Sequence, residues 1–127
     1  MTTPSSHSDS RPWYTIANVD QVPSPALLVY PDRVKENIAR MVRDAGGPAR
    51  LRPHIKTHKM TEVARLQMAA GIDKFKCSTL AEAEMLARAG AQDILLAFPQ
   101  VGPNAGRFAR LVADFPAPNN NIFLIGQ

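Results

Sequence analysis

The sequence predicts an α/β fold in which parallel strands alternate with helices, as in part of a (β/α)8 TIM-type barrel. Short apolar runs recur along the 127 residues, amphipathic stretches follow them, and glycine or proline separates the two. The predicted strands start near residues 51, 74, 93 and 121, which gives units of roughly twenty to thirty residues, a length typical of helical crossovers. An open doubly wound sheet uses the same units. A barrel needs at least about 200 residues, so this chain would contain about four βα units of the eight.

The first predicted elements lie between turn-forming residues. Residues 26–30 are an apolar run between two prolines and indicate a strand. Asp32 is the expected N-cap of a helix whose apolar positions share one stripe, and two glycines at 46–47 end it. Residues 51–56 are expected to form the second strand, and residues 59–70 the next helix, which Gly71 closes.

The same alternation continues to the end of the chain. Thr79 and Glu82 have the spacing of a capping box, which predicts a helix that Gly90 stops. A further helix is predicted over residues 104–114, and strands are predicted over residues 74–78, 93–98 and 121–125.

Composition excludes several classes of protein. The apolar fraction of 45% supports a real core, and no stretch approaches the roughly 20 apolar residues of a membrane-spanning helix. Residues 1–13 are polar, lack the apolar segment of a secretory signal, and are expected to be disordered. A cytoplasmic location is the default. Cys77 is the only cysteine, which excludes an internal disulfide and a thiolate-only metal site; we expect it to pack rather than react.

The net charge of +4 is scattered except for a dense basic run over residues 50–59. Side chains of a strand alternate between two faces, so Arg52, His54 and Lys56 should share the inward face of the sheet. Leu51, Pro53 and Ile55 should face the helices. Lys56 would then lie at the carboxyl end of its strand, where barrel enzymes place their chemistry, as an amine that can attack a carbonyl.

Other interpretations of this run remain open. A solvated surface lysine is the commoner role of such a residue. His54 and His58 are four residues apart, but a strand does not bring them onto one face as a helix would, so no metal site is expected. Nucleic-acid surfaces usually interleave aromatic and basic residues. Residues 50–59 contain no aromatic side chain, and no nucleic-acid partner is expected.

Segments spanning about residues 14–116 resemble one enzyme family. LRPHIKTHK at residues 51–59 resembles the RPHxKTHK segment of the D-threonine aldolase and D-serine dehydratase-like enzymes, which are alanine racemase-type, fold-type III enzymes dependent on pyridoxal 5′-phosphate (PLP). SPALLV at residues 24–29 resembles the opening segment of that family. The βα unit over residues 74–90, with its EAE-containing helix, and the segments DILLA and VGPN at residues 93–97 and 101–104 resemble the units that follow.

The resemblance implies a site and a reaction. Lys56, the first lysine of the motif, would hold PLP as a Schiff base, rather than Lys59, and His54 would lie beside the cofactor. The implied reaction is retro-aldol cleavage of a D-threonine-like amino acid to glycine and an aldehyde. D-serine dehydration and PLP binding without catalysis are the alternatives.

The resemblance also bears on the extent of the chain. Residues 14–127 would be the N-terminal part of the barrel, because the family is roughly three times longer than this chain. The ligands of a divalent metal would lie beyond Gln127, and a homodimer is left open. Residues 117–127 do not resemble the family's usual continuation, so a fragment or frameshift end is also left open, and a fragment of this kind is expected to be inactive.

Overall fold

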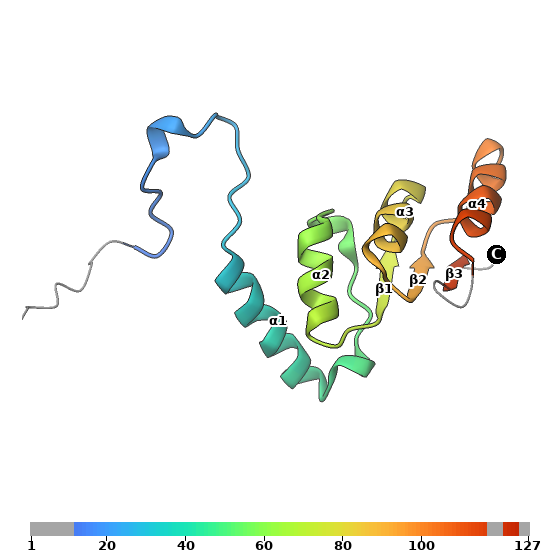
Figure 1. The fold of residues 1–127 in the computed structure, drawn as a ribbon, viewed down its shortest axis with the longest axis horizontal. Helices are drawn as coiled ribbons and strands as arrows, with labels where there is room; N and C mark the ends of the chain where they lie inside the picture. The colour runs from blue at the N-terminus through green and yellow to red at the C-terminus, as the bar shows by residue number, and fades with distance from the viewer. Residues whose placement is uncertain (1–11, 117–120, 125–127) are drawn as a thin grey trace, which may run out of the picture.

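The computed structural model describes residues 12–116 and 121–124, which form alternating helices and strands (Figure 1). In chain order these are α1 (Pro31–Ala45), α2 (Thr61–Ala69), β1 (Lys74–Cys77), α3 (Leu80–Ala89), β2 (Asp93–Leu96), α4 (Pro103–Asp114) and β3 (Asn121–Leu124). Short 3-10 turns lie at Val19–Gln21, Pro48–Arg50 and Ile55–Thr57. The α/β prediction is confirmed.

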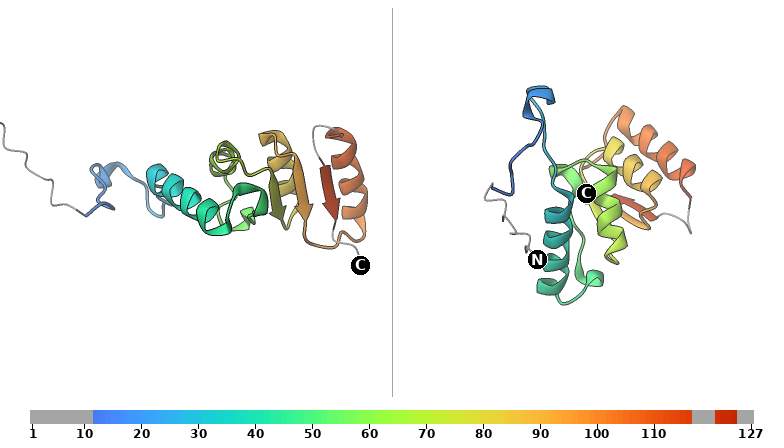
Figure 2. Two further views of the ribbon diagram at one scale, coloured as in Figure 1. Left: turned by 90° about the horizontal axis from the view of Figure 1, so that it is seen from below. Right: turned by 60° about the vertical axis from the view of Figure 1, so that its left-hand side comes forward.

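The three strands form one parallel sheet in the order β1-β2-β3. Lys74 pairs with Asp93, which pairs with Asn121, so the strands start level with one another. The crossovers α3 and α4 connect them, as expected for parallel neighbours. Helices α1 to α4 follow one another in space, each packed on the next (Figures 1 and 2).

One face of the sheet packs against the helices and forms the core. Side chains alternate along β1 and β2, so that every second one is fully buried. The core combines Phe75, Cys77, Ile94 and Leu96 of the strands with residues of the helices and loops, among them Ile55, Ala64, Ile72, Ala83 and Leu86. The remaining strand residues lie on the other face, which no described helix covers (Figure 2).

Local signals set most helix ends. Gly46 and Gly90 end α1 and α3 in the left-handed conformation, and each donates its N–H to carbonyls of the last turn. Thr79 Oγ1 accepts the N–H of Glu82 at 3.2 Å, as the predicted capping box requires. The predicted N-cap at Asp32 is wrong, because Pro31 already occupies the first helical position, which proline favours.

Two predicted strands are not formed. Residues 26–30 are largely exposed and pair with no described residue, because they lie away from the sheet (Figure 1). Residues 51–56 make one parallel bridge, His54 to Lys76, where the Lys76 N–H donates to the Pro53 carbonyl at 2.9 Å. Proline has no N–H to extend this ladder, and the turn at Ile55–Thr57 ends the extended stretch.

The amino-terminal segment leads into α1. The predicted disorder of residues 1–13 falls mostly outside the described residues. Trp13 is described, and its ring packs edge to face on Tyr30 with centroids 5.2 Å apart, with the Arg33 guanidinium 4.8 Å from its centroid. Within the described ranges, no helix is both long and apolar enough to span a bilayer.

Candidate functional site

Lys56 lies at the edge of the sheet where the strands end. The parallel bridge aligns His54 with Lys76, one residue before the end of β1, so Lys56 emerges beside the carboxyl ends of the strands. Its side chain is exposed, and its amine has no hydrogen-bond or ion-pair partner among the described residues. The turn Ile55–Thr57, which contains Lys56, is anchored by Ile55, whose side chain is fully buried in the core. The burial of Ile55 keeps the adjacent lysine at the surface.

His54 connects Lys56 to β1. Its Nδ1 accepts the backbone N–H of Lys56 at 3.2 Å, and its Nε2 lies 3.0 Å from Ser78 Oγ. Burial lowers the pKa of His54 below the usual range of an imidazole; the cations of Lys56 and Lys76 lower it further, and Glu82 opposes them. His54 is therefore neutral near pH 7. Since Nδ1 accepts a hydrogen bond, Nε2 carries the ring proton of the neutral imidazole and donates a hydrogen bond to Ser78 Oγ.

Lys59, the second lysine of the motif, has a different environment. Its Nζ lies 3.3 Å from Oε1 of Glu82, whose side chain is 5% exposed. Glu82 Oε2 also accepts the backbone N–H of Ser78 at 2.8 Å. Burial alone would raise the pKa of Glu82, but the Ser78 hydrogen bond and the Lys59 ammonium together lower it. The Lys59 side chain is thus ion-paired with a buried carboxylate.

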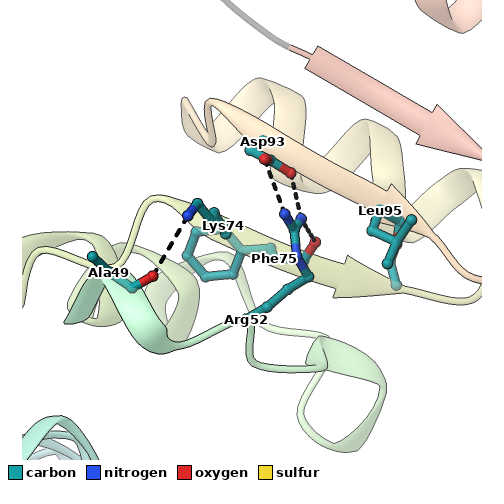
Figure 3. A network of polar contacts seen from close by, with 7 residues as sticks. Ala49, Arg52, Lys74, Phe75, Asp93 and Leu95 are labelled. Atoms are coloured by element: carbon teal, nitrogen blue, oxygen red, sulfur yellow. Dashed lines mark hydrogen bonds and ion pairs between the residues drawn. The ribbon is translucent and has the colours of Figure 1, made fainter. Parts of the chain in front are cut away.

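Arg52 attaches residues 51–57, the bridged segment, to the sheet (Figure 3). Its guanidinium makes two hydrogen bonds to the Asp93 carboxylate at the start of β2, the second at 2.9 Å, and one to the Phe75 carbonyl at 3.3 Å. Hydrogen bonding to Asp93 raises the pKa of Arg52 further. Strand alternation predicts Arg52 on the inward face, but no local signal identifies its partner Asp93, which lies 41 residues away in the sequence.

Cys77 and His58 are packed into the structure. Burial, with a contribution from Glu82, raises the pKa of the Cys77 thiol to about 12, so this residue is an inert core thiol. His58 Nδ1 accepts the Met60 N–H at 3.1 Å, and burial lowers its pKa. Its Nε2 is buried without a partner among the described residues. No group of three or more metal-ligating side chains is found in residues 12–116 and 121–124.

A cavity of about 450 Å³ lies next to this site and was not identified from the sequence. It is formed between the ends of β1 and β2 and the first turns of α3 and α4. Its lining residues are Ser78, Thr79, Leu80, Ala81, Phe98, Gln100, Asn104 and Arg107. The rule that sites form beyond the carboxyl ends of parallel strands is the signal that would have found it.

The chain belongs to a known class. Residues 29–114 match the family model described as "Alanine racemase, N-terminal domain", so the chain is a member of that family and the predicted resemblance is confirmed. The match includes the bridged segment, all four helices and strands β1 and β2.

Two individual proteins also match parts of the chain. A D-threo-3-hydroxyaspartate dehydratase from Delftia sp. (strain HT23) is 50% identical over 76 residues, 58% of this chain and 20% of the dehydratase. A D-threonine aldolase from Arthrobacter sp. is 43% identical over 53 residues, 42% of this chain and 14% of the aldolase. The matched part of this chain thus spans a fifth or less of these relatives. No solved structure matches the chain.

Proposed function

We propose that this chain is part of a PLP-dependent lyase that acts on 3-hydroxy D-amino acids, with Lys56 as the Schiff-base lysine. The observation that carries the proposal is the contrast between the two motif lysines. The amine of Lys56 is exposed and unpaired within the described residues, at the carboxyl ends of the strands, whereas Lys59 is ion-paired with a buried carboxylate.

The residues present fit a cofactor that carries an aldehyde. Such a group condenses with a primary amine that is accessible and can lose its proton. The Lys56 amine is accessible and meets no described partner, whereas the Lys59 amine is engaged in the ion pair with Glu82. His54 accepts the Lys56 backbone N–H, which orients the turn that carries the amine.

The remaining chemistry divides between cofactor and chain. Bound PLP would supply an electron sink for a bond broken at the substrate Cα. The chain's own contribution is positional: Lys56 attaches the cofactor, and the sheet holds His54 and Ser78 beside it. The three parallel strands and the bridged segment would form about half of a (β/α)8 barrel, whose rim is the usual place for such a site.

The names of the two relatives support the substrate class. D-threonine and D-threo-3-hydroxyaspartate are both D-configured amino acids with a hydroxyl on Cβ. The first candidate reaction is retro-aldol cleavage, in which the Cα–Cβ bond breaks, the hydroxyl loses its proton and Cα gains one, giving glycine and an aldehyde. Loss of the hydroxyl as water, giving an oxo acid and ammonia, is the second candidate. The longer and more identical match to the dehydratase favours it.

Reduction of the imine tests the assignment of Lys56. The complete protein, with any sequence beyond these 127 residues, would be incubated with PLP, reduced with borohydride and mapped by peptide mass spectrometry. We expect the pyridoxyl group on Lys56, none in Lys56→Ala, and an unchanged amount in the matched variant Lys59→Ala. Label on Lys59 would reverse the assignment.

Product analysis tests the reaction. D-Threonine and D-threo-3-hydroxyaspartate would be supplied separately, and glycine, aldehyde, oxo acid and ammonia measured. Glycine with aldehyde supports the aldolase, and oxo acid with ammonia supports the dehydratase. PLP attached to Lys56 without turnover of either substrate would indicate a non-catalytic PLP-binding protein. Turnover that chelation abolishes and a divalent cation restores would support the metal that the resemblance implies.

A further inference from the structure

The cavity between α3 and α4 is connected to Lys56 by two hydrogen bonds. The Lys56 N–H donates to His54 Nδ1, and His54 Nε2 lies 3.0 Å from Ser78 Oγ. Ser78 follows β1 directly and lines the cavity. The cavity is therefore linked, through Ser78 and His54, to the backbone of the residue whose amine would hold the cofactor.

The protonation of His54 fixes what Ser78 offers to the cavity. The lone pair of Nδ1 is used by the Lys56 N–H, so neutral His54 carries its proton on Nε2. Ser78 Oγ must then accept from Nε2, and its own proton is not available to the imidazole. No acceptor for the hydroxyl proton lies among the described residues. Glu82, the nearby carboxylate, accepts the backbone N–H of Ser78 instead. The Ser78 hydroxyl can therefore donate a hydrogen bond to an oxygen atom of a molecule bound in the cavity.

The charge of the cavity lining selects the kind of oxygen. Arg107 is the charged side chain among the lining residues, and no carboxylate lines the cavity. The Asn104 side-chain carbonyl accepts from Arg107 at 3.4 Å, which leaves the amide N–H₂ of Asn104 as a donor. The lining thus combines the hydrogen-bond donors of Ser78 and Asn104 with one cation, Arg107. An anionic, planar group of two oxygens, such as a carboxylate, complements this lining.

We propose that this cavity is a carboxylate-binding subsite in which Ser78 and Arg107 bind a carboxylate of the substrate. The inference rests on the proposed function for the identity of that substrate. The carboxylate is the one on Cα or a second one on the side chain, and the two sources share the same recognition chemistry. Leu80, Ala81 and Phe98 would cover the apolar part of the bound molecule.

Binding of unreactive acids tests the subsite without turnover. Succinate and D-lactate would be titrated into the complete protein by calorimetry. Arg107→Gln should weaken binding about tenfold or more, the usual effect of losing a charged hydrogen-bond partner. Arg110→Gln is the matched control, because it removes the same charge from the same helix but does not line this cavity. Arg107→Lys should recover part of the affinity. Equal binding by wild type and Arg107→Gln would overturn the proposal.

Substitution of Ser78 gives a second, independent test of the subsite. Ser78→Ala should weaken binding severalfold, and Ser78→Thr, which keeps the hydroxyl, should weaken it less. Circular dichroism would confirm that each variant is folded. An effect of Ser78→Ala equal to that of Ser78→Thr would contradict the role of the hydroxyl.

Kinetics then identify which carboxylate is bound. If Arg107→Gln lowers kcat/KM for D-threo-3-hydroxyaspartate alone, the subsite holds the side-chain carboxylate and selects acidic substrates. If it lowers kcat/KM for D-threonine as well, the subsite holds the carboxylate on Cα. A fall in PLP affinity with unchanged binding of the acids would overturn the proposal, since the anion would be the cofactor's phosphate. Acid binding should persist in Lys56→Ala, so failure of the lyase proposal is distinguishable from failure of the subsite.

Discussion

Lys56 and Lys59 show how two identical side chains three residues apart acquire different surroundings. Lys59 has a left-handed backbone conformation, with φ of 49°, and its side chain reaches the buried carboxylate of Glu82 on α3. Lys56 precedes that reversal, and both side chains are exposed, but only that of Lys59 has an ion-pair partner among the described residues. The difference comes from the turn that follows Ile55, whose burial fixes which residues face the core. A motif that contains two lysines does not by itself say which one is free to react.

Cys77 should be unreactive in the folded protein. Its side chain is fully buried, and its pKa is raised to about 12 by burial and the nearby Glu82 carboxylate, so the thiolate that alkylating agents attack is scarce at pH 8. We expect iodoacetamide to label Cys77 only after denaturant is added, as followed by mass spectrometry. Rapid labelling of native protein at pH 8 would show that β1 opens easily or that the thiol is not buried.

The two described histidines of the motif should make the fold sensitive to mild acid. Burial lowers the pKa of both His54 and His58, so the unfolded chain binds protons at these imidazoles more readily than the folded one. Stability should therefore fall as the pH drops below about 6.5, by at most about 1.4 kcal/mol per imidazole for each pH unit. The pKa of Glu82 is also lowered, which adds a loss of stability below about pH 4.5.

Urea unfolding of the complete protein at pH 7.5 and 5.5 measures this effect. The double variant His54→Gln, His58→Gln should lose most of the difference between the two pH values. Stability that is unchanged or higher at pH 5.5 in the wild type would contradict the assigned direction of both pKa shifts.

At the scale of elements, the bridged segment over residues 51–57 is held by few contacts. One bridge to β1, the burial of Ile55 and the Arg52–Asp93 pair attach it to the sheet. The two charged side chains are 31% and 25% exposed, so the pair is only partly screened by solvent. Its two parallel hydrogen bonds also fix the orientation of the segment that leads to Lys56.

Removing one partner of this pair should loosen the segment. We expect Arg52→Ala or Asp93→Ala to lower the free energy of unfolding by about 1–3 kcal/mol, because each leaves a half-buried charge unpaired. The double variant should cost less than the sum of the two. Arg33→Ala, which removes an exposed ion pair with Glu36 on α1, is the matched control and should change stability by less than about 0.5 kcal/mol. Equal effects at the two sites would show that the Arg52 pair is merely a surface contact.

Elements with a complete local signal were predictable, and those that depend on a partner were not. Helices α1, α3 and α4 and the three strands follow from hydrophobic spacing, a capping threonine and glycines that fit the left-handed conformation. Residues 26–30 have the composition of a strand, but a strand also needs an edge to pair with, and none of the described strands lies beside them. The strand predicted over residues 51–56 is longer than the single bridge that forms, because the turn at Ile55–Thr57 comes from tertiary packing.

The candidate site was predictable to a similar degree. The alternation of residues 51–56 correctly assigned Ile55 to the core, and Lys56 was found at the exposed end. The partners could not be found, since Asp93, Ser78 and Glu82 come from other βα units. Arg107 and the cavity likewise require α3 and α4 to be placed side by side. Periodicity describes one element at a time and contains no information on such contacts.

At the scale of the whole molecule, the uncovered face of the sheet carries charged side chains as well as Leu95, and the edges of the sheet are open. Arg52, Lys74, Lys76 and Asp93 lie on the face that no described helix covers, with three cations against one carboxylate. The outer edge of β1 has a single bridge, and β3 pairs only with β2 among the described strands. Unpaired strand edges of this kind promote association with other chains. In the proposed barrel, further strands would pair with these edges and neutralise the cations.

The 127-residue chain expressed alone should therefore associate rather than behave as a stable monomer. The backbone groups of two open edges, an excess of cations on one face and large exposed side chains such as Leu27 and Phe98 all favour self-association. Crowded cations without partners cost up to several kcal/mol each when buried, against a total stability of about 5–15 kcal/mol for a domain. Multi-angle light scattering should show oligomers or aggregates, a dye for exposed apolar surface should bind, and PLP should bind weakly.

A longer protein that contains these residues is the control for this experiment, because the half-barrel proposal predicts that its further strands would pair with both sheet edges. It should be monodisperse, melt cooperatively and bind PLP at Lys56. If the 127-residue chain were instead a monodisperse monomer with a cooperative melt and turnover of a D-amino acid, its three strands would be sufficient as a folded unit. The half-barrel interpretation of its open edges would then have to be abandoned, since a closed and active fold leaves no edge to pair.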